Sequence, residues 1–181
     1  MGYPVRVTMF LVALLGLIVA LCSVRFSAAG EKPVGTENIA AIERARKTVR
    51  MLDDVYKLAV VLITDKYVQD KKSFPAGRAA VAWFKAISQK GWHEVRIIDA
   101  TGEPYNDANV ARDEFDREGI KQLKKGKAYY EQVERKEGKT YLRAITPIPV
   151  VMDKCMMCHE NYKLAKKNEP VGALSYRMPV E

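Results

Sequence analysis

Two cysteines and a histidine near the end of the chain have a spacing that indicates a specific chemistry. Residues 155–159 read CMMCH, so Cys155 and Cys158 stand three positions apart and His159 follows directly. Thiols at this spacing can hold a zinc ion, form a redox-active disulfide, or attach a haem whose iron is bound by the adjacent imidazole. The rest of the sequence favours one of these three kinds of site.

The supply of other ligands argues against zinc. A structural zinc ion takes four protein ligands, whereas outside this motif the chain has one histidine, His93, and one cysteine, Cys22, which lies in the N-terminal segment. A thioredoxin-like redox pair is expected where a strand leads into a helix of a βαβ unit. Pro147 and Pro149, just before the motif, do not fit that setting.

A haem of the c type accounts for every residue of the motif. The thiols of Cys155 and Cys158 form thioethers with the two vinyl groups of the porphyrin, and the imidazole of His159 becomes the proximal iron ligand. The sequence therefore predicts one covalently attached haem c. With a single motif, the protein cannot by itself conduct electrons over a long distance.

Residues 1–29 have the composition of an export signal. Arg6 precedes an apolar run over residues 7–21, and small residues at 27–29 offer a cleavage site. The apolar run is also nearly long enough to span a bilayer, so a cleaved signal peptide and a retained membrane anchor both stay open. Lipidation of Cys22 is a minor alternative. In each case we expect a periplasmic or other extracytoplasmic protein.

Composition and charge set further bounds. With 181 residues, 48% of them hydrophobic, the chain is expected to form one domain with a core, over residues 36–181. The net charge is +8, and removal of residues 1–29, which include Arg6 and Arg25, leaves +6. This surplus favours anionic partners or an anionic membrane face. Nucleic acid is not an expected partner of an exported chain.

The first element of this domain is expected to be a long amphipathic helix over residues 36–72, with Thr36 as its N-cap. Apolar residues recur there at steps of three and four, separated by charged ones. A helix from Glu37 to about Lys71 is roughly 50 Å long, which exceeds what one small domain needs to cover. We therefore expect it to pair with a second copy of the chain or to lead away from the membrane.

The remaining elements predict an α+β fold in which an antiparallel sheet has its helices packed on one side. A third helix is expected after a cap at Asp107 or Asn109, closed by Gly126. A hairpin turns at residues 137–138, and Pro147 and Pro149 are expected to stop its second strand. The expected order is helix 73–91, strand 93–99, turn 100–104, the third helix, strands 128–136 and 139–146, a loop with the motif, and strand 172–178.

In this order the chain resembles the family of single-haem, PAS-like c-type domains, which occur alone or as periplasmic sensing parts of chemotaxis receptors and histidine kinases. Four-helix cytochromes of the c′ type also carry a late motif, but they place it on a helix. The resemblance covers residues 45–180 and rests on VRII at 95–98, EPYN at 103–106, DEF at 113–115, LRAITP at 142–147, GALS at 172–175 and Pro179.

The resemblance implies a PAS-like sheet with the long helix against it, haem between them and His159 as the proximal ligand. It leaves the sixth iron ligand open. A thiolate from the long helix is excluded, because the helix has no cysteine. The candidates are His93, as an imidazole, and Met51, as a thioether; an open or water-filled position would admit nitric oxide or carbon monoxide.

Three further residues are candidates for contacts with the haem. Arg96 and Arg143 stand on expected strands, and guanidinium groups suit propionates. Tyr141, with Tyr130, is a candidate for lining the pocket. For each of these residues, ordinary packing or surface exposure explains its presence equally well.

The resemblance implies sensing of redox state or of a small ligand, or simple electron exchange. We expect any signal to pass to a separate partner protein. A one-haem electron carrier is the main alternative. We do not expect an enzyme, because haem catalysis needs acid and base groups on an open distal side, and a single uncertain histidine is little support for them.

Overall fold

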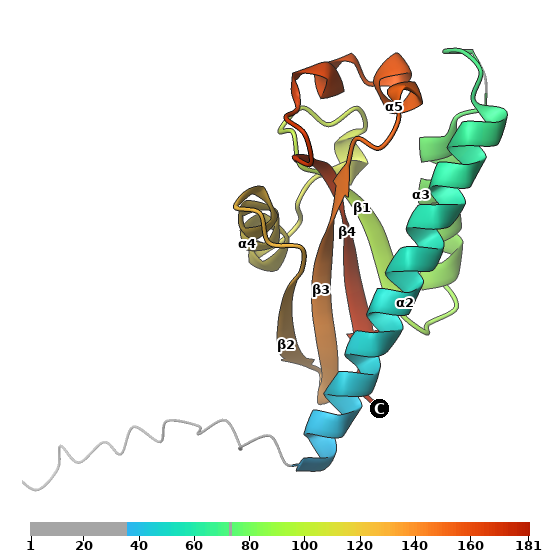
Figure 1. The fold of residues 1–181 in the computed structure, drawn as a ribbon. Helices are drawn as coiled ribbons and strands as arrows, with labels where there is room; N and C mark the ends of the chain where they lie inside the picture. Colours follow the sequence, from blue (N-terminus) through green and yellow to red (C-terminus); the bar gives the residue numbers. More distant parts are fainter. Residues whose placement is uncertain (1–35, 73) are drawn as a thin grey trace, which may run out of the picture. The chain divides into compact units, whose positions relative to one another are not determined.

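The four strands form one antiparallel sheet, which confirms the predicted α+β, PAS-like architecture. In the computed structural model, which describes residues 36–72 and 74–181, the spatial order of the strands is β1-β4-β3-β2 (Figure 1). The predicted export segment, with Cys22, and the expected helix start at Ser73 lie outside the described residues. Contacts along the chain group Gly35–Glu181 as one unit. The strands are β1 (Glu94–Asp99), β2 (Tyr130–Lys136), β3 (Lys139–Pro149) and β4 (Pro170–Pro179).

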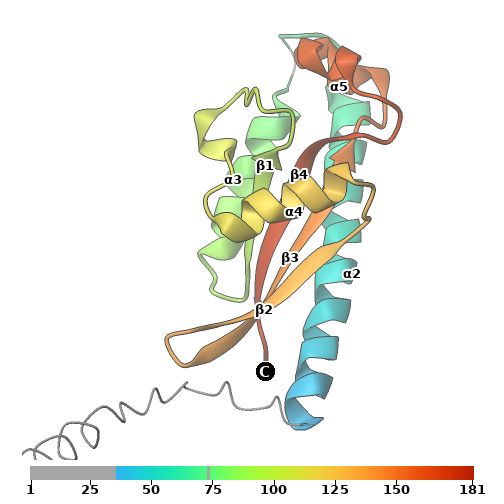
Figure 2. The ribbon, with the colours of Figure 1, turned by 90° about the vertical axis from the view of Figure 1, so that its left-hand side faces the viewer.

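The helices cover both faces of the sheet, so the expectation that they pack on one side was wrong. Helices α2 (Thr36–Tyr67) and α3 (Ala76–Ser88) lie against one face, and α4 (Glu114–Lys124) crosses the other (Figures 1 and 2). Successive residues of a strand point to opposite faces. Accordingly, the Tyr176 hydroxyl donates to Asp53 of α2, whereas the Ser175 hydroxyl donates to Asp116 of α4.

Each face therefore has its own hydrophobic core. A fully buried aliphatic or aromatic side chain contributes roughly 1.5–3 kcal/mol relative to its exposed state, so both layers contribute to holding the sheet. The core under α2 and α3 includes Val49, Tyr56, Phe84, Leu142 and Tyr176. The core under α4 consists of Ile98, Phe115, Leu123, Ile145 and Ala173.

Helix α2 is confirmed as the long first element, although it ends at Tyr67 rather than near Lys71. The chain turns after it, where the Asp70 carboxylate accepts a hydrogen bond from the backbone N–H of Lys72 at 2.8 Å. Aspartate commonly stabilises such a turn by bonding the backbone two residues on. In the described part of the chain, no helix combines the length and the apolar character needed to cross a membrane.

The third helix is capped by a different residue from those expected. Asp107 and Asn109 lie in a short 3-10 turn, η2 (Asp107–Asn109), and Asp113 is the N-cap of α4. The Asp113 carboxylate accepts from the backbone N–H of Asp116 at 2.9 Å, which is the usual geometry of a helix cap. Gly126 follows the helix with φ +91°, as expected of a closing glycine.

The hairpin is confirmed, but the prolines do not stop its second strand. Glu137 and Gly138 both have positive φ, which a two-residue turn of this type requires. Strand β3 then continues through Pro147 to Pro149, paired with β4. Strand β2 begins at Tyr130, opposite Ile145, so β3 is an edge strand beyond that point. Proline fits there because its missing N–H faces no neighbouring strand.

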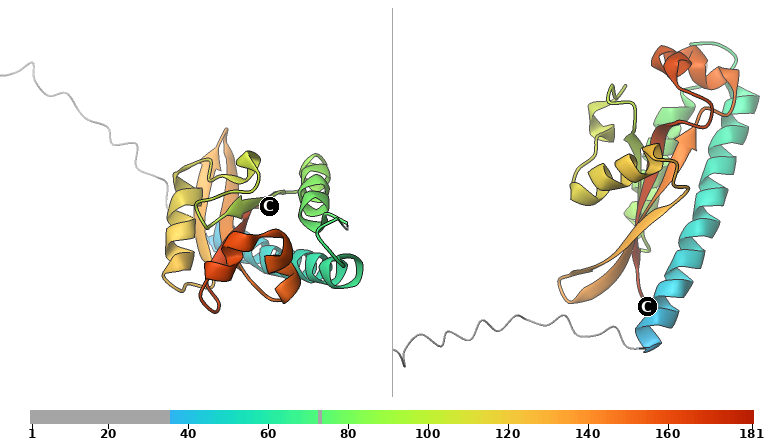
Figure 3. Two further views of the ribbon diagram at one scale, coloured as in Figure 1. Left: turned by 90° about the horizontal axis from the view of Figure 1, so that it is seen from above. Right: turned by 60° about the vertical axis from the view of Figure 1, so that its left-hand side comes forward.

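The CMMCH motif lies at one end of the sheet and on a helix, where a loop was expected. Helix α5 (Asp153–Cys158) and the 3-10 turn η3 (Glu160–Leu164) follow β3 and return the chain to β4. Seen from above in Figure 3, both lie over the end of the sheet at which α2 finishes. A motif on a helix was expected of the c′ type, but the four-stranded sheet rules out a four-helix bundle.

Candidate functional site

Helix α5 holds the two thiols of the motif on one face. Cys155 and Cys158 are three residues apart on this helix, a spacing that places side chains side by side. Both are free thiols; Cys158 is exposed and Cys155 is partly buried. The helix ends at His159, whose backbone N–H donates to the Cys155 carbonyl at 3.3 Å. The structure thus brings all three motif residues together.

Two tyrosines border the imidazole of His159. The Tyr162 ring stacks on it with centroids 4.5 Å apart, and the Tyr105 ring meets it edge-on at 5.3 Å. Burial lowers the pKa of His159, against the opposing effect of the Asp99 charge, so the ring is neutral at neutral pH. Among the described residues, none forms a hydrogen bond with this ring. Its nitrogens are therefore available to a ligand.

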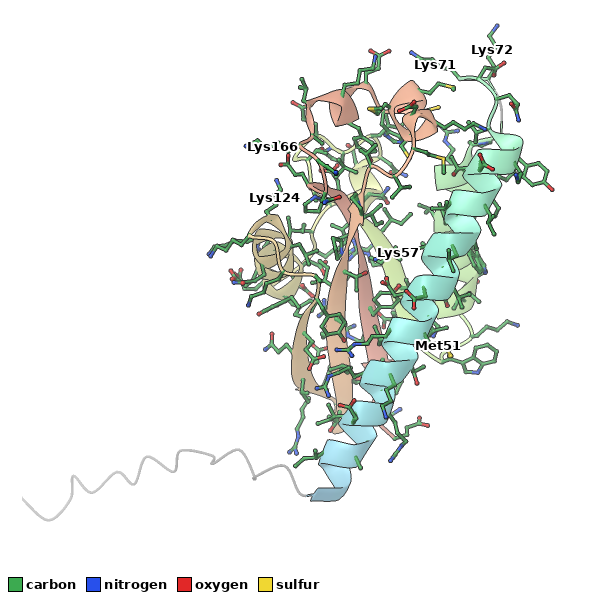
Figure 4. All side chains as sticks on the ribbon, viewed as in Figure 1. Met51, Lys57, Lys71, Lys72, Lys124 and Lys166 are labelled. Atoms are coloured by element: carbon green, nitrogen blue, oxygen red, sulfur yellow. The ribbon has the colours of Figure 1, made fainter. Side chains whose placement is uncertain are left out.

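A pocket of about 340 Å³ opens beside His159 and Cys158. One rim carries an ion pair between Lys71, which follows α2, and Glu160 of η3, with N and O 2.7 Å apart. Figure 4 shows Lys71 at the end of the molecule that carries α5. The pocket is therefore bordered by segments distant in sequence, from residue 71 to residue 161.

Besides the Lys71–Glu160 ion pair, two further polar contacts attach the motif segment to the rest of the domain. The Lys154 ammonium of α5 donates to the backbone carbonyl of Asp65 in the last turns of α2. The Asn161 side chain of η3 donates to the Thr101 hydroxyl, just after β1, at 3.4 Å. The Lys154 contact lies at the surface, where it positions the segment more than it stabilises it, and the Asn161 contact is partly buried.

The donor atoms of the motif fit an iron-containing group that is attached through thiols. The donors present are two thiols and a neutral imidazole, which is the donor set of a c-type haem. Three large apolar side chains nearby are exposed to solvent: Tyr105, Val151 and Leu164. Tyr105 lines the pocket, whereas Val151 and Leu164 stand before α5 and at the end of η3. These residues therefore fit haem c, with Cys155 and Cys158 as attachment points and His159 as a ligand.

Neither candidate for the sixth ligand lies near His159. His93 is only 6% exposed, and its Nε2 is 2.9 Å from the Tyr56 hydroxyl in the core under α2. His93 precedes β1, whereas Asp99, whose charge affects the pKa of His159, ends that strand. Six residues of strand span roughly 20 Å, so His93 lies about that far from Asp99. Met51 is 59% exposed on the lower half of α2 (Figure 4). It lies 14 residues before Asp65, or roughly 21 Å along the helix.

The arginine and tyrosine candidates also lie away from the motif. Arg96 and Arg143 both bind Asp116 on the α4 face of the sheet, at 3.0 and 3.3 Å. Tyr141 pairs with Pro179 near the opposite end of β3 from α5. Tyr130 stacks on Phe115, with centroids 5.5 Å apart. Contacts of these four residues with a group at His159 remain a prediction that this arrangement does not favour.

Sequence reasoning did not assign the two tyrosines around His159. Tyr162 could have been found from its position three residues after His159, which suits a helical turn. Tyr105 belongs to the EPYN stretch of the family resemblance, but nothing in its local pattern indicates contact with a residue 54 positions later. That contact depends on the antiparallel pairing of β1 with β4, which brings the two loops to one end of the sheet.

Fold and site together define a PAS-like α+β domain with a CMMCH motif at one end of its sheet. The chain belongs to the Tll0287-like family, whose model matches residues 36–179. Membership in this family suggests a domain of the sensor type. None of the curated proteins compared with the chain matches it.

Proposed function

We propose that this protein is an exported haem protein with one covalently attached haem c, acting as a sensor of redox state or of a small diatomic ligand. Cys155 and Cys158 would hold the haem through thioether bonds, and His159 would bind its iron. When bound, haem supplies reversible one-electron exchange and an iron site for a diatomic gas. Export is proposed from the arginine and the apolar run of residues 1–29.

The observation that carries the proposal is the arrangement at the end of α5. Two free thiols stand on one face of α5, and the imidazole that follows has no hydrogen-bond partner in the described part of the chain and borders a pocket. Tyr162 fixes the plane of the His159 ring by stacking, and burial keeps the ring neutral by lowering its pKa. A neutral imidazole is the form that binds iron.

Electron transfer is the second candidate function, and the exposure of the site favours it. Cys158 and Tyr105 are both exposed, so one edge of a haem attached there would be close to the surface and to a soluble redox partner. Family membership supports the sensor instead. We propose no enzymatic activity; negligible peroxidase and nitrite turnover by the pure haem protein is the expected result.

A sensor also needs a route to its partner, and helix α2 offers one. Met51, Val55, Leu58 and Leu62 are all exposed, at spacings of four, three and four residues. This is the pattern of a coiled-coil seam, and it can pair with the same stripe of a second copy. We propose a homodimer through this stripe, with a change in helix pairing as the signal.

The dimer is tested by light scattering on the purified haem protein. We expect a dimer for the wild type and a monomer for Leu58→Glu, because a charge in the seam must be desolvated. Val133→Glu, at an exposed position of the β2–β3 hairpin, is the matched control and should stay dimeric. A monomeric wild type, or a dimer that survives Leu58→Glu, would overturn the proposed interface.

Absorption spectra of the ferric and ferrous haem protein, with and without nitric oxide, test the function. A sensor of diatomic ligands should bind nitric oxide with a shift of the Soret band, while its exchange with a soluble cytochrome stays slow. A six-coordinate haem that does not bind nitric oxide and exchanges electrons rapidly with the cytochrome would favour the electron carrier over the sensor. Absence of any haem absorption from protein made with the attachment machinery would remove both.

A further inference from the structure

A second pocket, of about 210 Å³, lies on the α4 face of the sheet and has no part in the proposed haem site. Four arginines line it, Arg96, Arg112, Arg143 and Arg177, together with Glu94 and Asp113. The arginines come from β1, the segment before α4, β3 and β4 respectively. Arginines from four separate segments thus converge on one small cavity.

Three of these arginines are already paired with carboxylates. Arg96 donates to Asp116 at 3.0 Å, and Arg143 donates to Asp113 at 2.9 Å. Arg177 donates to Glu134 at 2.7 Å. Paired in this way, the three guanidinium groups form a rigid wall whose orientation is fixed before any ligand arrives.

Asp116 has no capacity left for a further cation. It is 0% exposed and accepts hydrogen bonds from Arg96, Arg143, the Ser175 hydroxyl and the backbone N–H of Arg112. Both of its oxygens are therefore satisfied. The backbone bond also fixes residue 112 at the mouth of the pocket.

The guanidinium of Arg112 is the exception, because it has no partner among the described residues although it lines the pocket. It lies close enough to Arg96 to lower the pKa of that group, an effect second to burial. Asp116 and Asp113 offset this repulsion between like charges at Arg96, but the guanidinium of Arg112 has no carboxylate partner of its own among the described residues. An anion beside Arg112 would supply one.

We propose that this pocket binds a small monocarboxylate, held by Arg112 and Arg96. The unpaired planar guanidinium of Arg112 matches the geometry of a carboxylate and can bind it with two parallel hydrogen bonds. Arg96, which already donates to Asp116 and to the carbonyl of Val110, adds its positive charge. Glu94 and Asp113 also line the pocket, so a dianion such as phosphate is repelled more strongly than a single negative charge. The same two acids can accept a hydrogen bond from a hydroxyl group of the ligand.

The site would give the domain a second input, independent of haem. It lies over β1, β3 and β4, and these strands also carry the core under α2 on their opposite face. A ligand on one face can therefore act on the packing of α2 through the same strands. Binding itself does not require the haem proposal to be correct.

Isothermal titration of the purified full protein with acetate, glycolate and phosphate, at constant ionic strength, tests the proposal. We expect saturable binding of acetate or glycolate, weakened at least tenfold in Arg112→Gln. Arg112→Lys, which keeps the charge but not the planar fork, should show an intermediate loss. Lys124→Gln, which removes a cation from the last turn of α4, is the matched control and should bind normally.

Three results would overturn the proposal. They are no binding of either carboxylate, binding that Arg112→Gln leaves unchanged, and phosphate binding tighter than that of both carboxylates. Because the Arg112 side chain is exposed and unpaired, Arg112→Gln should fold normally, which thermal unfolding of the variant checks.

Discussion

The two histidines of the domain lie in different environments, one in a core and one beside a pocket. Each is next to the end of a helix or strand, and each contacts a tyrosine. His93 is enclosed by the core under α2, where the Tyr56 hydroxyl bonds its Nε2. His159 lies at the rim of a pocket, and its ring nitrogens have no hydrogen-bond partner in the described part of the chain. Burial lowers the pKa of both imidazoles. The difference between His93 and His159, which we propose as an iron ligand, therefore lies in the hydrogen-bond partner and the access to the ring, not in the direction of the pKa shift.

Among the changes that test the proposed role of His159, loss of the two cysteines is expected to have the largest effect. Replacing both thiols, Cys155→Ser with Cys158→Ser, should abolish covalent haem completely, because no thioether can form. Haem staining of a denaturing gel measures this. Met156→Leu, between the two cysteines on the same helix, is the control and should keep the stain. Haem that stays covalently attached to the double variant would contradict the assignment.

The histidines themselves give the next largest effect. His159→Gln should shift the Soret band of the purified protein strongly, because an axial ligand is lost, while His93→Gln should leave it unchanged. Absorption spectra of both variants, made in the same way, measure this difference. A spectrum that responds to His93→Gln would return that residue to the list of iron ligands.

The sequence predicted some parts of this structure and missed others. The long first helix and the hairpin were correctly predicted, because each depends on local spacing, whereas the role of the motif residues stays a prediction. The placement of α4 on the second face was not predicted, since Phe115, Ile120 and Leu123 indicate an apolar stripe but not which face of the sheet it covers. Likewise, the strand pattern predicts that Arg96 and Arg143 lie on strands. It does not predict their common partner Asp116, because the position of Asp116 depends on where α4 packs.

The strand through Pro147 and Pro149 was missed for a related reason. Proline excludes a central position in a sheet, but not an edge, and whether β3 is an edge there depends on where β2 begins. His93 was ranked as a ligand because imidazole binds iron well. The side chain that hydrogen-bonds it in the structure, Tyr56, is 37 residues away, and no local pattern predicts that contact.

The core around His93 gives a smaller effect, on stability. Phe84 packs against Tyr56 there and is buried, so Phe84→Ala should lower the free energy of unfolding by about 3–5 kcal/mol through lost burial and a cavity. Urea unfolding measures this. Trp92→Ala, at an exposed position beside His93, should change it by no more than about 0.5 kcal/mol. Similar losses in the two variants would mean that this core is not packed as described.

The smallest expected effect is on the pH dependence of the free energy of unfolding. Burial lowers the pKa of His93 below its usual 6.5, so the unfolded chain binds a proton at this residue more readily than the folded one. Stability from this group is therefore present above pH 6.5 and lost as the pH falls toward the lowered pKa, with a slope of at most about 1.4 kcal/mol per pH unit. Urea unfolding at pH 7.5 and 5.5 should show a smaller difference for His93→Gln than for the wild type; equal differences would contradict a buried neutral His93.

The central claim is that CMMCH attaches one haem, and intact mass under denaturing conditions tests it most directly. Protein produced together with the haem-attachment machinery should have the mass of the mature chain plus one haem, and its colour should stay with the protein in acidified acetone. A mass equal to the chain alone, with any haem extracted into the acetone, would contradict the claim.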